Sequence, residues 1–309
     1  MGQYSPPFSA ALAISRLILK QFSMPIVTIV TPVFNASPWL GEMLASVAAQ
    51  TFDNWEQILV DDCSTDHSVA LIERAAASDP RIRLLKLDSN RGPAFARNRA
   101  LEVARGRYIA FLDADDLWLP EKLERCLEFM EQRQCSFVYH AFRYISADGR
   151  NLGAVVKGPS RLTFKTLHTR RGTGDCMSIV IDRTKAMDFR FFEVLRDCHE
   201  DWLAWRGLVL GGHVGFLLPS DLGRYRLSTG SRNADKITAA KKVWHLYREF
   251  ERLPWLRAAS WWLQYCWNSF WMRFHCRPQM HPNDGRGGFI GPRSRVRDAK
   301  RAHVAPVSE

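Results

Sequence analysis

Between residues 26 and 112 the chain alternates between short apolar runs and stretches whose apolar residues recur at helical spacing. The apolar runs predict buried strands at Ile26–Pro32, Gln57–Val60, Ile82–Leu87 and Tyr108–Leu112. The periodic stretches predict helices at Ser37–Val47, Ser68–Ala77 and Ala94–Ala104. Strands that alternate with helices favour an α/β, Rossmann-like fold, in which helices cover both faces of a mostly parallel sheet.

Polar side chains gather where the predicted strands end. Asn35 follows the first strand, Asp61 and Asp62 the second, and the acidic stretch Asp113–Asp116 the fourth. Ligands of open α/β sheets bind outside the carboxyl ends of the strands, so these clusters predict a binding site. Three carboxylates within four positions also repel one another. We therefore expect a cation, Mn²⁺ or Mg²⁺, to lie beside them.

Two neighbouring segments have simpler interpretations, which the residues alone leave open. Residues 61–66, DDCSTD, also suit an ordinary turn followed by a helix cap. Residues 90–100, NRGPAFARNRA, also suit a solvated loop and helix start whose arginines face water. We expect both segments and the acidic stretch to lie at the same edge of the sheet, which favours a joint role in binding a nucleotide diphosphate. The carboxylates would bind a divalent cation, and the arginines would bind phosphate oxygens.

Composition narrows the class of protein. The 309 residues carry a net charge of +11, which favours anionic partners. Seven cysteines without a CxxC pair indicate free thiols, not a disulfide framework or zinc site. The apolar stretch Ser9–Phe22 is too short and too charged for a membrane span, and Met24 is a candidate start.

Four motifs occur in a recognisable order: TPVFNASPWL, then QTF with VDDCSTD, NRGPAFARNRAL and FLDADDLW. Over residues 25–232 this set resembles the family-2 glycosyltransferases of GT-A fold. The resemblance implies a GT-A sheet and direct, inverting transfer of a sugar from a nucleotide diphosphate, with a UDP-sugar favoured. It implies the following donor-binding residues: Pro32, Phe34, Asn35, Asp62, Arg97, Asn98, Asp113 and Asp115. Of these, Pro32 would border the nucleotide base, and Asp62 would form a hydrogen bond with it. Asp115 and Asp116 are the implied metal ligands, and the pattern leaves their division of work open.

The second half supplies candidate catalytic residues. CHEDWLAWRGLVL at Cys198–Leu210 predicts a helix that opens with acids, which also suits simple complementarity with the helix dipole. The resemblance makes Asp201 the general base and Glu200 its neighbour. In Arg224–Ser231, RYRLSTGS, the family often has a histidine where Leu227 and Ser228 stand. Arg226 is the implied diphosphate contact, assisted by Ser231, with a surface salt bridge as the alternative.

The last part of the chain is rich in tryptophan and then in basic residues. On a helix over Trp255–Phe274, the polar residues Arg257, Ser260, Gln264 and Asn268 form one stripe beside a broad apolar face. This pattern suits a helix at a membrane interface, and the basic tail suits anionic lipid. The alternative is a helix docked on the catalytic domain. The predicted divisions are 1–23 (extension), 24–235 (transferase), 236–276 (amphipathic helices) and 277–309 (basic flexible tail).

Three other classes fit less well. A nicotinamide-dependent dehydrogenase needs glycines after the first strand, and TPVFNAS has none. A phosphatase with an aspartyl nucleophile would explain the clustered Asp residues, but the sequence lacks the Thr and Lys pattern that would support it. A non-enzymatic basic protein that binds nucleic acid or membrane is the main alternative, but acids stand where a basic groove would lie. We therefore expect a cytoplasmic transferase on the inner face of the plasma membrane. Its acceptor would be lipid-linked or a surface glycan, and it would bind no nucleic acid.

Overall fold

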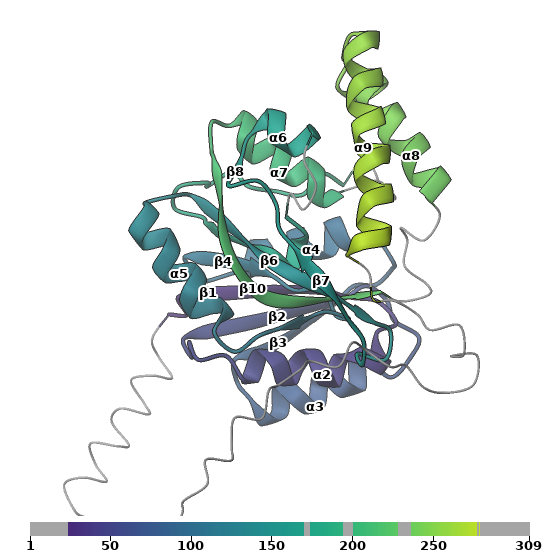
Figure 1. The fold of residues 1–309 in the computed structure, drawn as a ribbon. Coiled ribbons are helices and arrows are strands. Elements are labelled where there is room, and N and C mark those ends of the chain that lie inside the picture. The colour runs from purple at the N-terminus through teal and green to yellow at the C-terminus, as the bar shows by residue number, and fades with distance from the viewer. Residues whose placement is uncertain (1–23, 170–173, 194–199, 228–235, 277, 279–309) are drawn as a thin grey trace, which may run out of the picture.

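The structure is a computed structural model that describes residues 24–169, 174–193, 200–227, 236–276 and 278 (Figure 1). The predicted extension 1–23, Ser231 and nearly all of the predicted basic tail lie outside the described residues. The first half contains β1 (Val27–Val33), α2 (Ser37–Ala48), β2 (Trp55–Asp61), α3 (Ser68–Ser78), β3 (Ile82–Lys86), α4 (Pro93–Val103), β4 (Tyr108–Phe111), β5 (Leu117–Trp118) and α5 (Lys122–Arg133). The four strands and three helices predicted up to residue 112 are confirmed.

The second half adds strands to the same sheet and then a helical region. Its elements are β6 (Phe137–Ser146), β7 (Leu152–Val156), β8 (Arg161–Leu162), α6 (Phe164–Thr169), the short 3₁₀ turn η1 (Cys176–Ser178), β9 (Ile179–Asp182), α7 (Glu200–Leu210), β10 (Gly215–Leu227), α8 (Lys236–His245), the π-helical turn η2 (Leu246–Phe250) and α9 (Trp255–His275).

One sheet runs through the domain in the order β3-β2-β1-β4-β9-β6-β10-β5. β1 to β4 pair in parallel, as predicted. β9 lies antiparallel between β4 and β6, while β10 pairs in parallel with β6, so the sheet is mixed beyond β4. The chain order reverses direction between β1 and β4. In open α/β sheets this reversal opens a crevice at the carboxyl ends of the strands.

Helices cover both faces of the sheet, as predicted. In β1, Val27, Ile29 and Val33 pack in one hydrophobic cluster with α2, α3 and α5. Val30, on the opposite side of the strand, packs in a second cluster with α4 and α7. Successive strand residues point to opposite faces, so a strand that is apolar throughout is buried on both.

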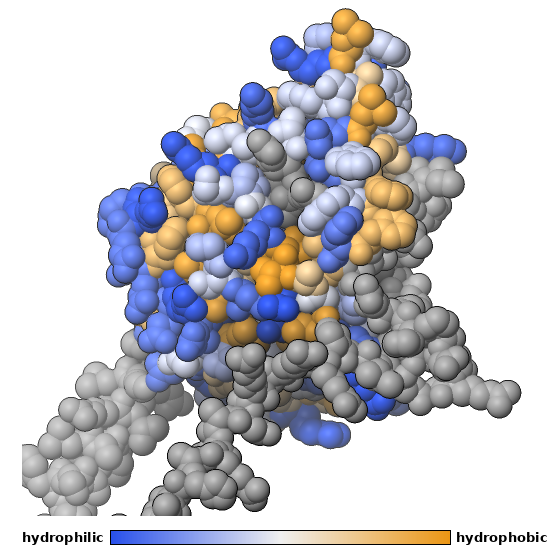
Figure 2. Space-filling model, viewed as in Figure 1, coloured by the Kyte–Doolittle hydropathy of each residue, from blue (hydrophilic) through white to orange (hydrophobic). Residues whose placement is uncertain are grey.

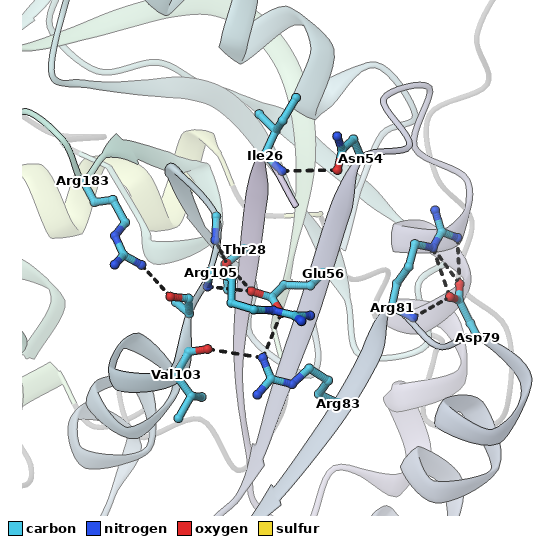
Figure 3. Close-up of polar contacts among 12 residues, drawn as sticks. Ile26, Thr28, Asn54, Glu56, Asp79, Arg81, Arg83, Val103, Arg105 and Arg183 are labelled. Carbon is cyan, nitrogen blue, oxygen red and sulfur yellow. Dashed lines mark hydrogen bonds and ion pairs between the residues drawn. The ribbon is translucent and has the colours of Figure 1, made fainter. Parts of the chain in front are cut away.

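A buried carboxylate, Glu56, links neighbouring segments by hydrogen bonds at the amino ends of the strands, the edge opposite the predicted binding site (Figure 3). Glu56 of β2 accepts hydrogen bonds from Thr28 Oγ1 and from the backbone nitrogen of Arg105, each at 2.8 Å. Burial alone would raise the pKa of Glu56, but bonds from Arg105, Thr28 and Arg83 lower it. A Cβ on Gly106 would lie 2.4 Å from the Thr28 nitrogen. This network therefore sets the spacing of β1, β2 and the loop before β4.

The C-terminal helices dock on α6 and α7 through an aromatic junction. The His168 ring lies 4.7 Å from Trp202 of α7 and 4.5 Å from Trp261 of α9, measured between ring centroids. Burial lowers the pKa of His168 to about 4, so the ring is neutral near pH 7. Arg206 of α7 also forms an ion pair with Glu251, just after η2. One face of α9 is therefore docked on the catalytic domain, as the alternative interpretation proposed.

The other face of α9 is exposed and apolar. The helix predicted over 255–274 is confirmed, and Figure 2 shows apolar side chains along its length. Its exposed large apolar residues are Trp255, Leu256, Leu263, Trp267, Phe270 and Phe274. We call Leu256, Leu263, Trp267, Phe270 and Phe274 the apolar stripe. Within the described part of the chain, no helix combines the length and the apolar character that a membrane crossing requires.

Candidate active site

The loops after β1 and β2 are joined by short hydrogen bonds. Asn35 adopts a left-handed backbone (φ +48°), which asparagine tolerates better than most residues. Its side-chain oxygen accepts a bond of 2.8 Å from the nitrogen of Thr65, and its own nitrogen donates to Ser64 Oγ at 3.0 Å. Pro32 is a partly exposed residue near the end of β1, and the side chain of Phe34 is exposed. The predicted donor-binding residues Pro32, Phe34 and Asn35 thus share one rim, here called the base-side rim because Pro32 is expected to border the base.

Asp62 connects that rim to the segment before α4. It is buried, and its two carboxylate oxygens accept bonds of 2.7 Å from the backbone nitrogens of Arg91 and Gly92. Gly92 has φ +86°, a conformation that favours glycine. Asp62 therefore orders the turn into α4. Its predicted contact with the nucleotide base stays a prediction.

Arg97 joins two acidic segments that are far apart in the sequence. Its buried guanidinium donates to Asp113 at 2.6 Å and lies 3.4 Å from a carboxylate oxygen of Glu200. Burial alone would lower the pKa of Arg97, but the charges of Asp113 and Glu200 raise it overall. Arg97 is therefore a permanent cation at the centre of the site, and it relieves part of the repulsion among the acids.

Asn98, the neighbour of Arg97, has a different role in the fold. Its amide nitrogen donates to the Phe191 carbonyl at 2.9 Å and to Glu193 at 2.7 Å, and its oxygen accepts from the Phe191 nitrogen. Both ends of the side chain thus hold the segment 191–193 against α4. The predicted donor contact of Asn98 stays a prediction.

The residues Asp113–Asp116, here called the acid loop, form a tight turn after β4. The nitrogen of Asp116 donates to the Asp113 carbonyl at 3.1 Å. The Asp113 and Asp115 side chains are partly exposed, whereas Asp116 is only 2% exposed. Burial, and then the charges of Asp115 and Asp113, raises the pKa of Asp116 well above its usual value. The two partly exposed carboxylates therefore face the site, and Asp116 lies beneath them.

Arg226 lies beneath the acid loop, near the end of β10. Its side chain is 1% exposed, unlike the exposed salt bridge that was the alternative prediction. Its nitrogens contact Asp116 and the Asp115 carbonyl, and also Ala147 and Glu42. The diphosphate contact expected for Arg226 stays a prediction, and the contacts observed here join Arg226 to the acid loop.

Asp201 and Glu200 occupy the first turn of α7, as predicted, where the helix dipole favours carboxylates. Asp201 Oδ1 accepts from the Trp202 nitrogen at 2.7 Å. Glu200 is 8% exposed, while Asp201 is partly exposed and is therefore the more accessible of the two acids. Residues 194–199, which include Cys198 and His199, lie outside the described residues.

Asp175 is an acid of the site that the sequence analysis missed. It precedes η1 and β9, and the adjacent Gly174 carbonyl accepts a bond of 3.1 Å from Trp205 of α7. Burial, and then the charges of Asp201 and Asp113, raises the pKa of Asp175 to about 7. No motif marks residues 174–178, because Asp175 reaches the site only through the insertion of β9 between β4 and β6.

The site thus brings together acids from three segments: the acid loop, Asp175 and the start of α7. Nevertheless, the described residues contain no group of three His, Cys, Asp or Glu side chains placed to hold a metal ion by themselves. A separate cavity of about 410 Å³ lies between residues 185–192 and α7, lined by Phe189, Phe192 and Gly207 among others. No predicted site residue lines that cavity, so the acid-lined edge of the sheet is the better candidate.

Comparison with known proteins identifies the family. Residues 28–196 match the family described as glycosyl transferase family 2. The chain is 36% identical to the teichuronic acid biosynthesis glycosyltransferase TuaG of Bacillus subtilis (strain 168), over 79% of this chain and 96% of TuaG. It is 33% identical to the Escherichia coli protein WfgD, a UDP-Glc:alpha-D-GlcNAc-diphosphoundecaprenol beta-1,3-glucosyltransferase, over 74% of this chain and 88% of WfgD.

Solved structures share the fold. S. aureus TarS in complex with UDP-GlcNAc superposes with a TM-score of 0.60 at 19% identity, covering 81% of this chain and 73% of TarS. The mannosyltransferase PcManGT from Pyrobaculum calidifontis, in complex with GDP-Man and Mn²⁺, gives a TM-score of 0.58 at 16% identity, covering 86% and 85%. The predicted GT-A fold is confirmed, and the non-enzymatic alternative is not supported. The chain is a glycosyltransferase and belongs to glycosyl transferase family 2.

Proposed function

We propose that the enzyme transfers one sugar from a nucleotide-diphosphate donor, with a UDP-sugar favoured, to a hydroxyl group of a lipid-linked or surface-glycan acceptor. The observation that carries this proposal is the convergence of the acid loop and the α7 acids around Arg97. One side of such a site suits a diphosphate with its cation, and the other suits a general base. The relatives TuaG and WfgD, through their names, support the acceptor class.

The transfer itself follows from the placement of Asp201. Its carboxylate takes the proton of the acceptor hydroxyl while the hydroxyl oxygen attacks the anomeric carbon. The bond from that carbon to the diphosphate oxygen breaks, and the nucleoside diphosphate leaves with the electron pair. Attack from the side opposite the diphosphate inverts the anomeric configuration. Arg97 holds Asp113 and lies close to Glu200, which fixes the acid loop relative to α7.

The acid loop suits a divalent cation in the donor complex. Mn²⁺ and Mg²⁺ prefer oxygen ligands, and Mg²⁺ is commonly held by one or two carboxylates together with substrate phosphates. The partly exposed Asp115 would supply one ligand, with Asp113 or the deeper Asp116 beside it. Burial, and then the charges of Asp115 and Asp113, raises the pKa of Asp116, and a bound cation would offset the repulsion among these carboxylates. When bound, the ion would stabilise the leaving diphosphate.

A screen of nucleotide sugars by thermal shift tests the proposal. The purified protein is heated with UDP-, GDP-, ADP- and CMP-linked sugars, each with Mn²⁺ and with EDTA. We expect at least one donor, a UDP-sugar, to raise the Tm in Mn²⁺ and not in EDTA. If no donor raises the Tm under either condition, the proposed donor class is wrong.

We also propose that the enzyme works on the inner, cytoplasmic face of a membrane, and that the apolar stripe of α9 contacts it. Trp267 and Phe270 are exposed in the middle of this helix, and tryptophan rings favour the headgroup region. Vesicle flotation with phosphatidylglycerol tests the contact. Leu263→Ser/Trp267→Ser/Phe270→Ser should float less than wild type. The control Leu152→Ser/Met187→Ser alters exposed apolar residues elsewhere and should float normally. Equal flotation of all three proteins would overturn the contact.

A further inference from the structure

We infer that Arg226 and Glu42 form a strut that positions the acid loop, and that this is the main role of Arg226. The inference rests on the proposed function, because it concerns the carboxylates that would face the cation and the donor. Arg226 is the second-last residue of the long strand β10, whereas Glu42 belongs to helix α2. Their side chains meet at 2.7 Å.

Arg226 holds the loop by its main chain and its side chain together. Its backbone nitrogen donates to Asp116 Oδ1 at 2.8 Å, and its Nε donates to the Asp115 carbonyl at 2.8 Å. The first bond fixes the buried carboxylate, and the second fixes the peptide unit from which the Asp115 side chain projects. Arg226 thereby sets the direction of both candidate ligands, although it need not touch the donor.

The remaining contacts place the guanidinium between two other parts of the fold. Nη1 donates to the Ala147 carbonyl at 3.0 Å, in the turn between β6 and β7. Gly149 of that turn has φ +74°, and a Cβ there would lie 3.2 Å from Nη1, so glycine permits the close approach. Nη2 donates to Glu42 at 2.7 Å. A guanidinium that is 1% exposed depends on such partners, because an unpaired buried charge is strongly destabilising.

Glu42 links the acid loop to the base-side rim through α2. At the start of this helix, the nitrogen of Ala36 donates to Ser68 Oγ, and that of Ser37 donates to Asp66, both at 2.9 Å. The same helix therefore contacts the loop after β2 at its amino end and Arg226 further along. In the proposed function, the base-side rim and the acid loop bind two parts of the same donor. The strut would keep them at one separation.

Two matched variants test the strut. Glu42→Ala removes the carboxylate partner of Arg226, whereas Glu73→Ala removes a carboxylate from the neighbouring helix α3. Glu42 and Glu73 are 56% and 55% exposed, with ion pairs of 2.7 and 2.6 Å, but the partner of Glu73 is Lys86, in β3. Arg226→Lys, which keeps the charge and loses the forked geometry, is a third variant.

Hydrogen exchange of peptides that cover residues 112–119 gives a readout that needs no ligand. We expect Glu42→Ala and Arg226→Lys to exchange faster there than wild type, and Glu73→Ala to match wild type. The Mn²⁺ concentration that gives half of the Tm shift with UDP should rise by up to about fivefold in Glu42→Ala, the upper end of what the loss of one part-exposed charged contact produces.

The outcomes separate the strut from the proposed function. If exchange over 112–119 in Glu42→Ala equals that of wild type, the strut is wrong, whatever the enzyme's activity. If exchange rises while wild type shows no Tm shift with Mn²⁺ and any nucleotide, the strut holds and the proposed donor chemistry fails. A rise of the same size in Glu73→Ala would also overturn the strut, because the effect would then not be specific to Arg226.

Discussion

Arg97 donates a hydrogen bond of 2.6 Å to Asp113, and this contact ties helix α4 to the acid loop. The same guanidinium lies 3.4 Å from Glu200, in the first turn of α7. A buried arginine is tolerated only when carboxylates compensate its charge. Here the compensating carboxylates come from two segments that are distant in the sequence. The contact therefore explains how an acidic strand end is tolerated before any cation binds.

The first prediction concerns the general base. Asp201→Asn should lower kcat by roughly 10²–10⁴-fold, because the amide cannot take the proton of the acceptor hydroxyl. Donor binding should be unchanged, since Asp201 lies on α7 and outside the acid loop. Measured together, turnover and the Mn²⁺-dependent Tm shift with the donor separate the two effects. Glu200→Gln is the companion variant, and a larger loss of kcat there than in Asp201→Asn would move the base to Glu200.

A second prediction addresses the cation. Asp115→Ala should raise the Mn²⁺ concentration needed for half of the donor-induced Tm shift by about tenfold or more, because a carboxylate ligand is lost. Asp188→Ala removes an exposed carboxylate beside the separate cavity and serves as the control. An unchanged Mn²⁺ requirement in Asp115→Ala would show that this carboxylate is not a ligand.

The third prediction follows from the raised pKa of Asp175, about 7 against an ordinary value of 3.8. Between these pH values the folded chain binds more protons at this position than the unfolded chain. Asp175 therefore makes the free energy of unfolding fall as pH rises from about 4 to 7. The asparagine of Asp175→Asn cannot titrate. The free energy of unfolding of this variant, relative to that of wild type, should therefore increase from about pH 4 to pH 7 and stay constant above pH 7.

Chemical unfolding in EDTA at several pH values measures this difference for Asp175. Asp188→Asn, an exposed acid, should keep a constant difference from wild type between pH 5 and 8. Parallel curves for Asp175→Asn and wild type over the whole range would contradict a raised pKa in the folded protein.

A fourth prediction concerns Lys122, which is fully buried with its ammonium group 3.5 Å from the centre of the Trp118 ring. Burial lowers the pKa of Lys122 to about 7, from 10.5 in its ordinary state. The unfolded chain thus binds more protons between pH 7 and 10.5, and stability falls as pH drops through that range. Lys122→Met should be more stable than wild type near pH 6, by up to roughly 4 kcal/mol.

The advantage of Lys122→Met should shrink as the pH rises towards 10. Urea unfolding at pH 6, 8 and 9.5 follows the trend, and Lys86→Met, at an exposed lysine, should show no such trend. A Lys122→Met variant that is less stable than wild type at pH 6 would mean that the contact with Trp118 outweighs the cost of burying the charge.

Much of the first half of the fold could be predicted from local sequence. The strands from Ile26 to Leu112 are apolar throughout because both faces of the sheet are covered, and the intervening helices show clear periodicity. Carboxyl ends of parallel strands share one edge, so the convergence of Asn35, Asp62 and the acid loop followed from the order of elements alone. The acids of α7 also appear in sequence, through their position at a helix start.

Only the tertiary structure decided which distant residues meet these segments. Asp175 and Arg226 reach the site because β9 enters the sheet between β4 and β6, and β10 lies beyond β6. Such an order depends on long-range pairing, which no local pattern encodes. Packing likewise makes Arg226 a buried partner of Asp116 and Glu42, where the sequence predicted a diphosphate contact with a surface salt bridge as the alternative. Sequence thus determined the chemistry at the sheet edge, and packing determined which cations and acids surround it.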